Sequence, residues 1–309
     1  MSIVFVIDKD EKPLLPTNPA RARRLLNSGK ARVKQVVPFT IQLERKIDNP
    51  IGEFEVGVDD GAKYVGIAIK NSKTNDIVFH SQINHRQDVS RKVEQRSNYR
   101  SARRYRLRNR KPRFKNRIKS RIVPSIRQRK EVIIRVLKDM NKRLNIKNVI
   151  VEEVKFNHSR NKYGKYFSLV EIGKKFLKDE IKKLGYGYIR TYGYITKPNR
   201  IQLGLSKTHS HDACAIVKSN KILDREYQIK PRRTRVWENN PSKKCTEKNG
   251  FMHYDLIKAR HRTKGYVIGS IRSLKKTVIS VRTKYDDSFI VSYNKSRVLQ
   301  KFNGLIYSY

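Results

Sequence analysis

The stretch FEVGVDDGAKYVGIAI, residues 54–69, decides the fold class that this sequence predicts. Two β-rich runs flank the turn residues Asp59, Asp60 and Gly61, which is a hairpin signal. Residues 76–83 follow as a third apolar run of strand length. We therefore expect a β-hairpin and a third strand, with a carboxylate at the end of the first strand.

Beyond this hairpin the chain alternates helical and strand patterns. Residues 125–144 place apolar side chains at helical spacing, and residues 168–184 do the same. Between them, residues 148–154 are expected to form a short buried strand. Residues 188–194 predict another strand, and residues 206–218 have the pattern of a helix. Strands that alternate with helices in this way indicate an α/β core.

The two ends of the chain differ from this core. The N-terminal part predicts strands at Ile3–Ile7 and Phe39–Leu43, a turn at Pro13–Pro16, and a basic helix that ends near Gly29. Residues 264–293 show several short alternating runs with turn residues between them, which favours a small β-barrel or a curled sheet. We therefore expect a small N-terminal domain and a β-rich C-terminal domain beside the α/β core.

Charge is the dominant feature of the composition. The 309 residues include 72 Lys+Arg against 27 Asp+Glu, a formal net charge of +45. The length suggests two or three modules. Such an excess of positive charge indicates a polyanionic partner, with nucleic acid as the first candidate and an anionic membrane as the weaker one.

The same sequence argues against several other classes of protein. No apolar run reaches the roughly 18–20 residues of a membrane-spanning helix, and the N-terminus turns acidic too early for a signal peptide. Cys214 and Cys245 lie far apart and form neither a disulfide framework nor a C-x-x-C zinc site. We expect a cytoplasmic protein without zinc, associated with the nucleoid when it is bound to DNA.

Basic residues are densest in residues 91–117, where about half the residues are Lys or Arg and Glu94 is the only acid. A helix with arginines around most of its circumference has no face to bury in protein, but phosphates can surround it. The planar guanidinium suits this role because it binds two phosphate oxygens at once. Pro112 is expected to end or kink the helix. The alternatives are a solvated or disordered basic tail and a non-specific DNA-binding segment.

Carboxylates among apolar residues need an explanation in so basic a chain. Asp59 follows the run EVGV, Glu152 lies within VIVEEV, and Asp212 follows His209 by three positions on one helix face. If the three acids converge, a divalent cation must neutralise them, and oxygen ligands suit Mg²⁺ or Mn²⁺. Two such ions, about 3.5–4 Å apart, position a phosphodiester for in-line attack by water.

Each of these residues also has a simpler interpretation. Asp59 has the position of an ordinary turn residue, and Asp212 that of an acid on a helix surface. Glu152 and Glu153 alternate, so one of them should face solvent. His209 either orients or deprotonates the attacking water, or it caps a helix or has no role in the reaction.

Several stretches resemble the IscB and IsrB proteins, which are encoded by transposons. The resemblance covers nearly the whole chain, and the PLLP block, the arginine stretch and the H-x-x-D-A sequence together make it specific. It rests on PLLP with ARARRLLNSGKARVKQVVPFTIQL, VGVDDGAKYVGIAI, RSARRYRLRNRKPRFKNR, PSIRQRKE with VIVEEVKFN, YGYITKPNRIQLGLSKTHSHDACAI and GFMHYDLIKARHRTKGYVIGSI.

This resemblance implies an RNA-guided DNA endonuclease with an RNase H-like (RuvC) core that is split by an arginine-rich bridge helix. Its implied partners are a structured guide RNA (an omega RNA) and a double-stranded DNA target with one displaced strand. The protein is expected to act as a monomer in the ribonucleoprotein. The implied domains are 1–50 (PLMP-like), 51–90 (RuvC-like segment I), 91–117 (bridge helix), 118–222 (RuvC-like segments II and III) and 223–309 (β-rich, contacting guide RNA and the target-adjacent motif).

The resemblance also implies roles for individual residues. Asp59, Glu152, His209 and Asp212 match the catalytic set, and Asp59, Glu152 and Asp212 match the ligands of two Mg²⁺ or Mn²⁺ ions. The implied guide-RNA contacts are Arg96, Arg100, Arg103, Arg104, Arg106, Arg108, Arg110, Arg113 and Arg117. The candidate contacts to the DNA motif are Arg260, Arg262, Arg272 and Lys275.

Two departures from the family pattern bear on function. Asp60 stands where the family commonly has proline, which leaves Asp59 and Asp60 as alternatives for the first metal ligand. Residues 158–206 contain His158 but no cysteine and are too short for an inserted HNH nuclease, so the chain is closest to IsrB and is expected to nick only the displaced strand. The alternatives are a catalytically silent RNA-guided DNA-binding protein and an unguided RuvC-type junction resolvase.

Overall fold

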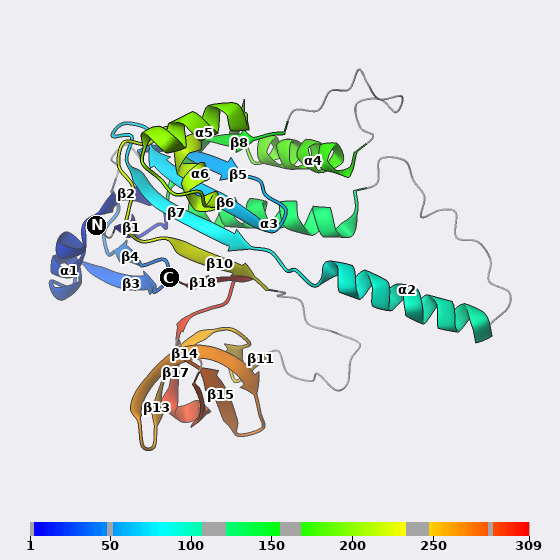
Figure 1. The fold of residues 1–309 in the computed structure, drawn as a ribbon. Helices are drawn as coiled ribbons and strands as arrows, with labels where there is room; N and C mark the ends of the chain where they lie inside the picture. The colour runs from blue at the N-terminus through cyan, green and yellow to red at the C-terminus, as the bar shows by residue number, and fades with distance from the viewer. Residues whose placement is uncertain are drawn as a thin grey trace. The chain divides into compact units, whose positions relative to one another are not determined.

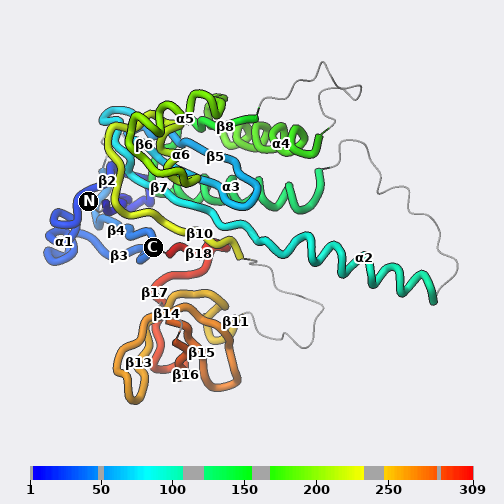
Figure 2. The backbone as a smooth tube through the Cα atoms, viewed as in Figure 1, coloured from blue at the N-terminus to red at the C-terminus, as the bar shows by residue number. Residues whose placement is uncertain are grey.

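The computed structural model describes residues 3–47, 52–106, 122–154, 168–232, 247–283 and 287–308. These form two compact units, one built from residues 51–228 and the other from residues 2–50 with 229–309. Figure 1 shows the elements of each unit, and Figure 2 traces the same backbone. The mixed α/β class expected for the core is confirmed, whereas the division into five functional segments stays a prediction.

The first unit is built on a mixed sheet. The strands that lie wholly within this unit are β5 (Glu53–Asp59), β6 (Tyr64–Asn71), β7 (Ile77–Asn84), β8 (Asn145–Glu152) and β9 (Gly187–Thr191), in the order β7-β6-β5-β8-β9. The strand β6 is antiparallel to both β5 and β7, whereas β8 runs parallel to β5 and β9 runs parallel to β8. The predicted hairpin and third strand are therefore confirmed.

Four helices of the first unit pack on one another or on this sheet (Figure 1). They are α3 (Pro124–Asn141), α4 (Leu169–Lys183), α5 (Gly193–Gln202) and α6 (His209–Ile216). The helix α3 begins with a proline in its first turn, where the missing N–H costs nothing. Its apolar stripe is fully or almost fully buried, as the spacing predicted: Val132, Ile133, Val136, Leu137 and Met140.

Two glycines bring α6 unusually close to the sheet. A Cβ atom on Gly66 of β6 would lie 1.7 Å from the backbone oxygen of His209, and one on Gly57 of β5 would lie 2.4 Å from that of Ala213. Any larger residue would push the helix away from both strands. The glycines within the hairpin therefore place the start of α6 beside the end of β5.

The helix α5 was not predicted. Residues 188–194 were expected to be a strand, but β9 ends at Thr191 and the chain turns into α5 at Gly193. Glycine at the start and Pro198 inside the helix both disfavour helix on propensity alone. Packing on α6 overrides this preference, and the Asn199 amide donates to the Ala215 carbonyl over 3.3 Å.

The helix α2 (Val89–Arg106) follows β7 in the first unit (Figure 1). None of its side chains is buried. Residues 90–106 are all exposed. This confirms that the arginine-rich segment is helical over its first part. Pro112, where the helix was expected to end or kink, lies outside the described residues.

The second unit contains a small N-terminal sheet. Its strands β1 (Val4–Ile7), β2 (Pro13–Thr17), β3 (Ala31–Gln35) and β4 (Thr40–Leu43) lie in the order β2-β1-β4-β3. The predicted turn at Pro13–Pro16 is wrong, because this segment is the edge strand β2, where proline is tolerated. The helix α1 (Pro19–Asn27) ends as predicted, with Gly29 in the left-handed region at φ +69°.

The second unit also contains a five-stranded sheet in the C-terminal part of the chain. Its order is β16-β15-β14-β13-β17 and all its pairs are antiparallel. The predicted β-rich region is therefore confirmed. The strands are β13 (Leu256–His261), β14 (Gly265–Leu274), β15 (Val278–Arg282), β16 (Ser288–Ser292) and β17 (Ser296–Gln300).

Short elements complete the described chain: β10 (Tyr227–Pro231), β11 (Glu247–Lys248), β12 (Phe251–Met252), β18 (Leu305–Ser308) and the 3₁₀ turn η3 (Tyr293–Lys295). Among the described residues, no helix has both the length and the apolar character required to cross a bilayer.

Candidate active site

Two carboxylates meet at one edge of the mixed sheet. Asp59 is the last residue of β5, Glu152 is the last residue of β8, and the two are register partners in this parallel pair. Neighbouring strands lie about 4.8 Å apart, so the two side chains leave the sheet side by side. Residues far apart in sequence thus share one edge because parallel strands end together.

The start of α6 completes this acidic edge. The Thr208 side chain caps α6 by accepting from the His211 backbone N–H at 3.1 Å. The His209 Nδ1 atom lies 2.5 Å from the Asp59 Oδ2 atom. Asp212 follows three residues later, on the same side of the helix. We call Asp59, Glu152, His209 and Asp212 the acidic centre.

Burial and neighbouring charge change the chemistry of Asp59. Its side chain is only 14% exposed. Burial raises the pKa of Asp59 to about 6, the His209 hydrogen bond opposes this rise, and the negative charges of Glu152 and Asp212 add to it. The three carboxylates therefore act on one another, and a cation placed among them would favour their ionised forms.

A basic side chain contacts Asp212 of the acidic centre. The Arg200 Nε atom of α5 lies 2.7 Å from the Asp212 Oδ1 atom, and both side chains are mostly buried. Arg200 also donates to the Leu205 carbonyl at 3.1 Å. The sequence analysis missed Arg200, because nothing in the spacing of α5 distinguishes it from the many other arginines.

Asp60 lies on the other side of the sheet edge. Its carboxylate forms an ion pair and hydrogen bond with Lys130 of α3, and the two side chains are 8% and 12% exposed. Successive residues at a strand end point to opposite faces. The geometry therefore brings Asp59 together with Glu152, His209 and Asp212, and it directs Asp60 away from them.

Glu153 was expected to differ from Glu152 in exposure. That expectation is wrong, because both side chains are half-buried. The Tyr188 hydroxyl of β9 donates a hydrogen bond to the Glu153 carboxylate, and burial together with this contact raises the pKa of Tyr188. This cross-strand hydrogen bond explains how Glu153 is accommodated.

The acidic centre fits hard divalent cations in its chemistry. Its three carboxylates offer oxygen atoms, which Mg²⁺ and Mn²⁺ prefer. Burial raises the pKa of Asp59, and repulsion by Glu152 and Asp212, which a cation would relieve, adds to the rise. No set of three His, Cys, Asp or Glu side chains within the described ranges is grouped closely enough to hold one ion. Asp59 and Asp212 instead contact His209 and Arg200.

Only the predicted RNA contacts up to the end of α2 lie within the described residues. Arg96, Arg100, Arg103, Arg104 and Arg106 are exposed on this helix. Arg108, Arg110, Arg113 and Arg117 lie outside the described residues.

The predicted contacts to a DNA motif lie on the five-stranded sheet of the second unit. Arg260 on β13 and Arg272 on β14 are exposed on the same face, since Arg260 pairs with Tyr266 and side chains alternate along β14. Arg262 and Lys275 are exposed in the turns after β13 and β14. The same face carries Lys258, whose ammonium lies 4.4 Å from the Tyr266 ring centroid. Sequence analysis did not single out this pair.

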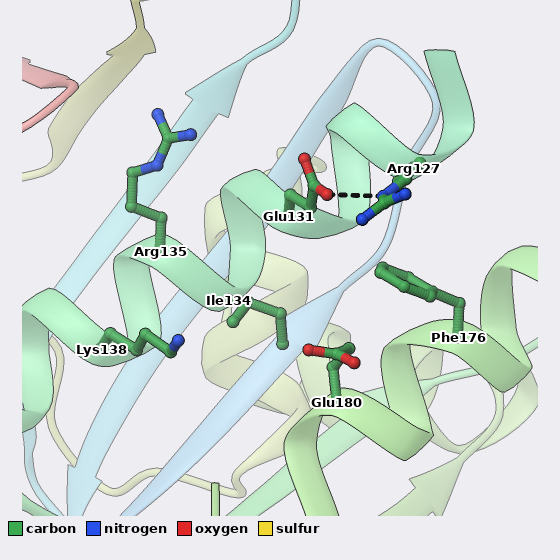
Figure 3. A pocket seen from close by; sticks show the side chains of 7 residues that line it. All are labelled: Arg127, Glu131, Ile134, Arg135, Lys138, Phe176 and Glu180. Carbon is green, nitrogen blue, oxygen red and sulfur yellow. Dashed lines mark hydrogen bonds and ion pairs between the residues drawn. The ribbon is translucent and has the colours of Figure 1, made fainter. Parts of the chain in front are cut away.

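A hollow of about 320 Å³ lies elsewhere in the first unit, between α3 and α4 (Figure 3). Arg127 forms an ion pair with Glu131 at 2.7 Å, and its guanidinium lies 5.9 Å from the Phe176 ring centroid. The hollow contains none of the four residues of the acidic centre. Its lining is Arg127, Glu131, Ile134, Arg135, Lys138, Phe176 and Glu180.

Fold and site thus define a mixed α/β protein with carboxylates gathered where β5 and β8 end. The family model described as RRXRR protein matches residues 4–171, which is more than half of the chain. The chain belongs to the RRXRR family. No curated protein matches it.

Solved structures give further similarities, all with low sequence identity. One is T. thermophilus RuvC in complex with a Holliday junction substrate, with 16% identity, a TM-score of 0.33, and coverage of 54% of this chain and 90% of that one. A second Thermus thermophilus RuvC structure has 16% identity, a TM-score of 0.31, and coverage of 53% and 91%. The simian T-cell lymphotropic virus intasome in complex with the PP2A regulatory subunit B56 gamma has 6% identity, a TM-score of 0.19, and coverage of 82% and 83%.

Proposed function

We propose that this protein is an RNA-guided, metal-dependent DNA endonuclease that nicks the displaced strand of its target. The observation that carries the proposal is the meeting of Asp59, Glu152, His209 and Asp212 at one sheet edge. A chain with a net charge of +45 has little reason to gather and bury carboxylates there unless cations are to join them. The sheet, with three antiparallel strands followed by two parallel ones, supports an RNase H-like (RuvC) core.

In the proposed mechanism, Asp59, Glu152 and Asp212 would hold the metal ions through their carboxylate oxygens. Bound Mg²⁺ or Mn²⁺ would supply an activated water and would neutralise the charge that develops on the phosphate. His209 donates from Nδ1 to Asp59, which fixes the ring and leaves Nε2 as its proton acceptor. Arg200 positions Asp212 through their ion pair.

A second region, the helix α2, supports the proposal that the protein binds a guide RNA. Its arginines are exposed over the whole described length of the helix, which supports a partner that surrounds it with phosphates. Together with the resemblance to IscB and IsrB, this supports a structured guide RNA. Base pairing would then select the target, while the protein contacts the backbone and a short adjacent duplex motif. We further propose that the protein acts as a monomer in the ribonucleoprotein and that it cuts one strand, since residues 158–206 are too short a stretch of sequence for an inserted HNH nuclease.

The proposal is tested by purifying the full-length chain with its native RNA, sequencing that RNA, and incubating the complex with supercoiled plasmid that carries the matching target. We expect one discrete RNA and Mg²⁺-dependent conversion to nicked circles. Asp59→Ala should reduce nicking at least about 100-fold, which corresponds to the few kcal/mol of charge stabilisation lost, without weakening target binding.

Asp224→Ala is the matched control, because it removes an exposed aspartate of the same unit. We expect this variant to nick the plasmid as the wild type does. Equal nicking by Asp59→Ala would show that the acidic centre is not the metal site. Target binding without nicking by the wild-type protein would indicate the catalytically silent alternative. Cleavage of branched DNA without any RNA would indicate an unguided junction resolvase.

A further inference from the structure

Two tyrosines lie beside the acidic centre at the start of α5. The rings of Tyr192 and Tyr194 are stacked, with centroids 5.7 Å apart and planes 9° from parallel. Tyr192, the N-cap residue, is half-buried, whereas Tyr194 is 72% exposed. The inner ring thus supports an outer ring that faces solvent. An offset stack of this kind is a favourable aromatic geometry, and it leaves Tyr194 with a surface on which a third ring can lie.

The pairing of β8 with β9 brings this stack next to Glu152, one of the proposed metal ligands. Thr191, which precedes Tyr192, is the register partner of Glu152. Gly193, which separates the two tyrosines, approaches Glu152 so closely that a Cβ atom on it would lie 3.2 Å from the Glu152 Oε1 atom. The backbone that carries the rings therefore borders the acidic centre directly.

An exposed lysine accompanies the outer ring. Lys197 follows Tyr194 by three positions on α5 and is exposed, so the two side chains are neighbours on the helix surface. An aromatic ring next to an ammonium group offers both parts of a single-strand site, a stacking surface for a base and a charge for a phosphate. Both lie in a chain whose net charge of +45 attracts polyanions.

We infer that Tyr194, backed by Tyr192, is a stacking platform for one nucleobase of the single-stranded DNA that enters the acidic centre. The inference rests on the proposed function and adds how the cut strand is held. An unpaired base has an exposed π-face, and stacking accepts any base. Duplex DNA keeps its bases stacked inside, so the platform selects unpaired DNA without selecting its sequence.

The test uses the full-length protein and a short oligodeoxynucleotide with one 2-aminopurine, in buffer with Ca²⁺ in place of Mg²⁺. Salt is raised stepwise to weaken phosphate-only binding elsewhere on the basic surface. The wild-type protein should quench 2-aminopurine fluorescence through stacking. Tyr194→Ala should lose that quenching and bind about 5-fold to 100-fold more weakly, whereas Tyr194→Trp should retain both.

Ile201→Ala is the matched control, since Ile201 is another exposed apolar residue of α5, at 62% exposure, and its loss should change neither signal. Tyr194 buries too little of its ring for its removal to unfold the unit, and circular dichroism verifies this. Equal quenching and affinity in wild type and Tyr194→Ala would overturn the inference. The inference would also be overturned if Tyr194→Ala weakened binding of an RNA oligonucleotide but not of the DNA oligonucleotide, because Tyr194 would then stack on RNA.

The outcomes separate this inference from the proposed function. If the wild-type protein does not nick DNA but Tyr194→Ala still abolishes quenching, the platform stands and the nuclease proposal fails. If Asp59→Ala abolishes nicking while Tyr194→Ala leaves quenching and nicking unchanged, the nuclease proposal stands and the platform fails.

Discussion

The acidic centre and the helix α2 belong to the same unit and treat charge in opposite ways. At the acidic centre, Asp59 and Asp212 are largely buried and each has a defined basic contact, His209 or Arg200. On α2, residues 90–106 are all exposed. One region has its charges fixed inside the protein, and the other presents them to solvent.

The difference follows from the cost of burying charge. A buried carboxylate without a counter-charge is expensive, so every acid brought to the sheet edge requires a basic partner or a metal ion. Exposed arginines remain hydrated and cost little until phosphates displace the water and counterions. The acidic centre thus has two of its charges paired within the protein, whereas α2 leaves its charges accessible to solvent.

The largest effect on stability is expected from the buried ion pair behind the acidic centre. Lys130→Met leaves the Asp60 carboxylate buried without its partner. We expect this variant to lose about 3–5 kcal/mol of unfolding free energy, measured by urea denaturation. The double variant Asp60→Asn with Lys130→Met should recover most of the loss, because it removes both charges.

The exposed pair Lys92–Asp88 at the start of α2 is the control for this prediction. Lys92→Met should leave the denaturation midpoint unchanged, because exposed ion pairs are screened by water and salt. Equal effects of Lys130→Met and Lys92→Met would contradict the contrast between buried and exposed charge.

A smaller effect is expected from Asp59 itself, and it depends on pH. The folded state raises the pKa of Asp59 from its ordinary value of 3.8 to about 6. The stabilising contribution of protonated Asp59 is therefore complete below about pH 4 and is lost as the pH rises through about 6. Without metal at pH 8, Asp59→Asn should be more stable than the wild type by up to about 3 kcal/mol, and the difference should vanish below pH 4.

Urea denaturation in EDTA across this pH range measures the difference, and added Mg²⁺ should reduce it by stabilising only the wild type. Asp88→Asn is a control of opposite sign, because Arg86 and Lys92 hold the pKa of Asp88 well below its usual range. A constant difference between wild type and Asp59→Asn from pH 4 to pH 8 would be inconsistent with a raised pKa in the folded state.

The smallest effect is expected from the exposed charges of α2. Replacing Arg100, Arg103 and Arg104 by Ala should weaken RNA binding about tenfold and reduce the salt slope, d log K/d log[salt], by about 2. The control replaces Lys73, Lys182 and Lys183, which are exposed elsewhere in the same unit, and should change the slope less. Equal changes in both triple variants would mean that α2 binds RNA no more specifically than the rest of the basic surface.

Local patterns were sufficient for several elements of the fold. The hairpin of β5 and β6 follows from alternation around Asp59, Asp60 and Gly61, and α3 and α4 follow from apolar spacing. The strand β2 and the helix α5 were missed because proline at an edge and glycine and proline in a helix oppose local propensity. Packing against neighbours decided both.

The candidate site, too, could be predicted from the sequence only in part. Asp59, Glu152 and Asp212 were identified from the sequence as carboxylates beside apolar runs in a basic chain, and the role of His209 came from the family resemblance. Their partners Arg200 and Lys130 were not, since 72 lysines and arginines give no local signal of which one contacts an acid. Nor did the spacing show that Asp60 points away from Asp59.

The sequence by itself determined the charge of this protein, its strand-turn-strand start, and the arginine-rich helix that has no face to bury. Only the tertiary structure decided that β5 and β8 end side by side, that Gly57 and Gly66 admit α6 against them, and that a tyrosine stack borders Glu152. The physical reason is that composition and periodicity act between residues close in the chain. A site that brings together Asp59 and His209, which are 150 positions apart, depends on which strands pair and on how closely a helix can pack.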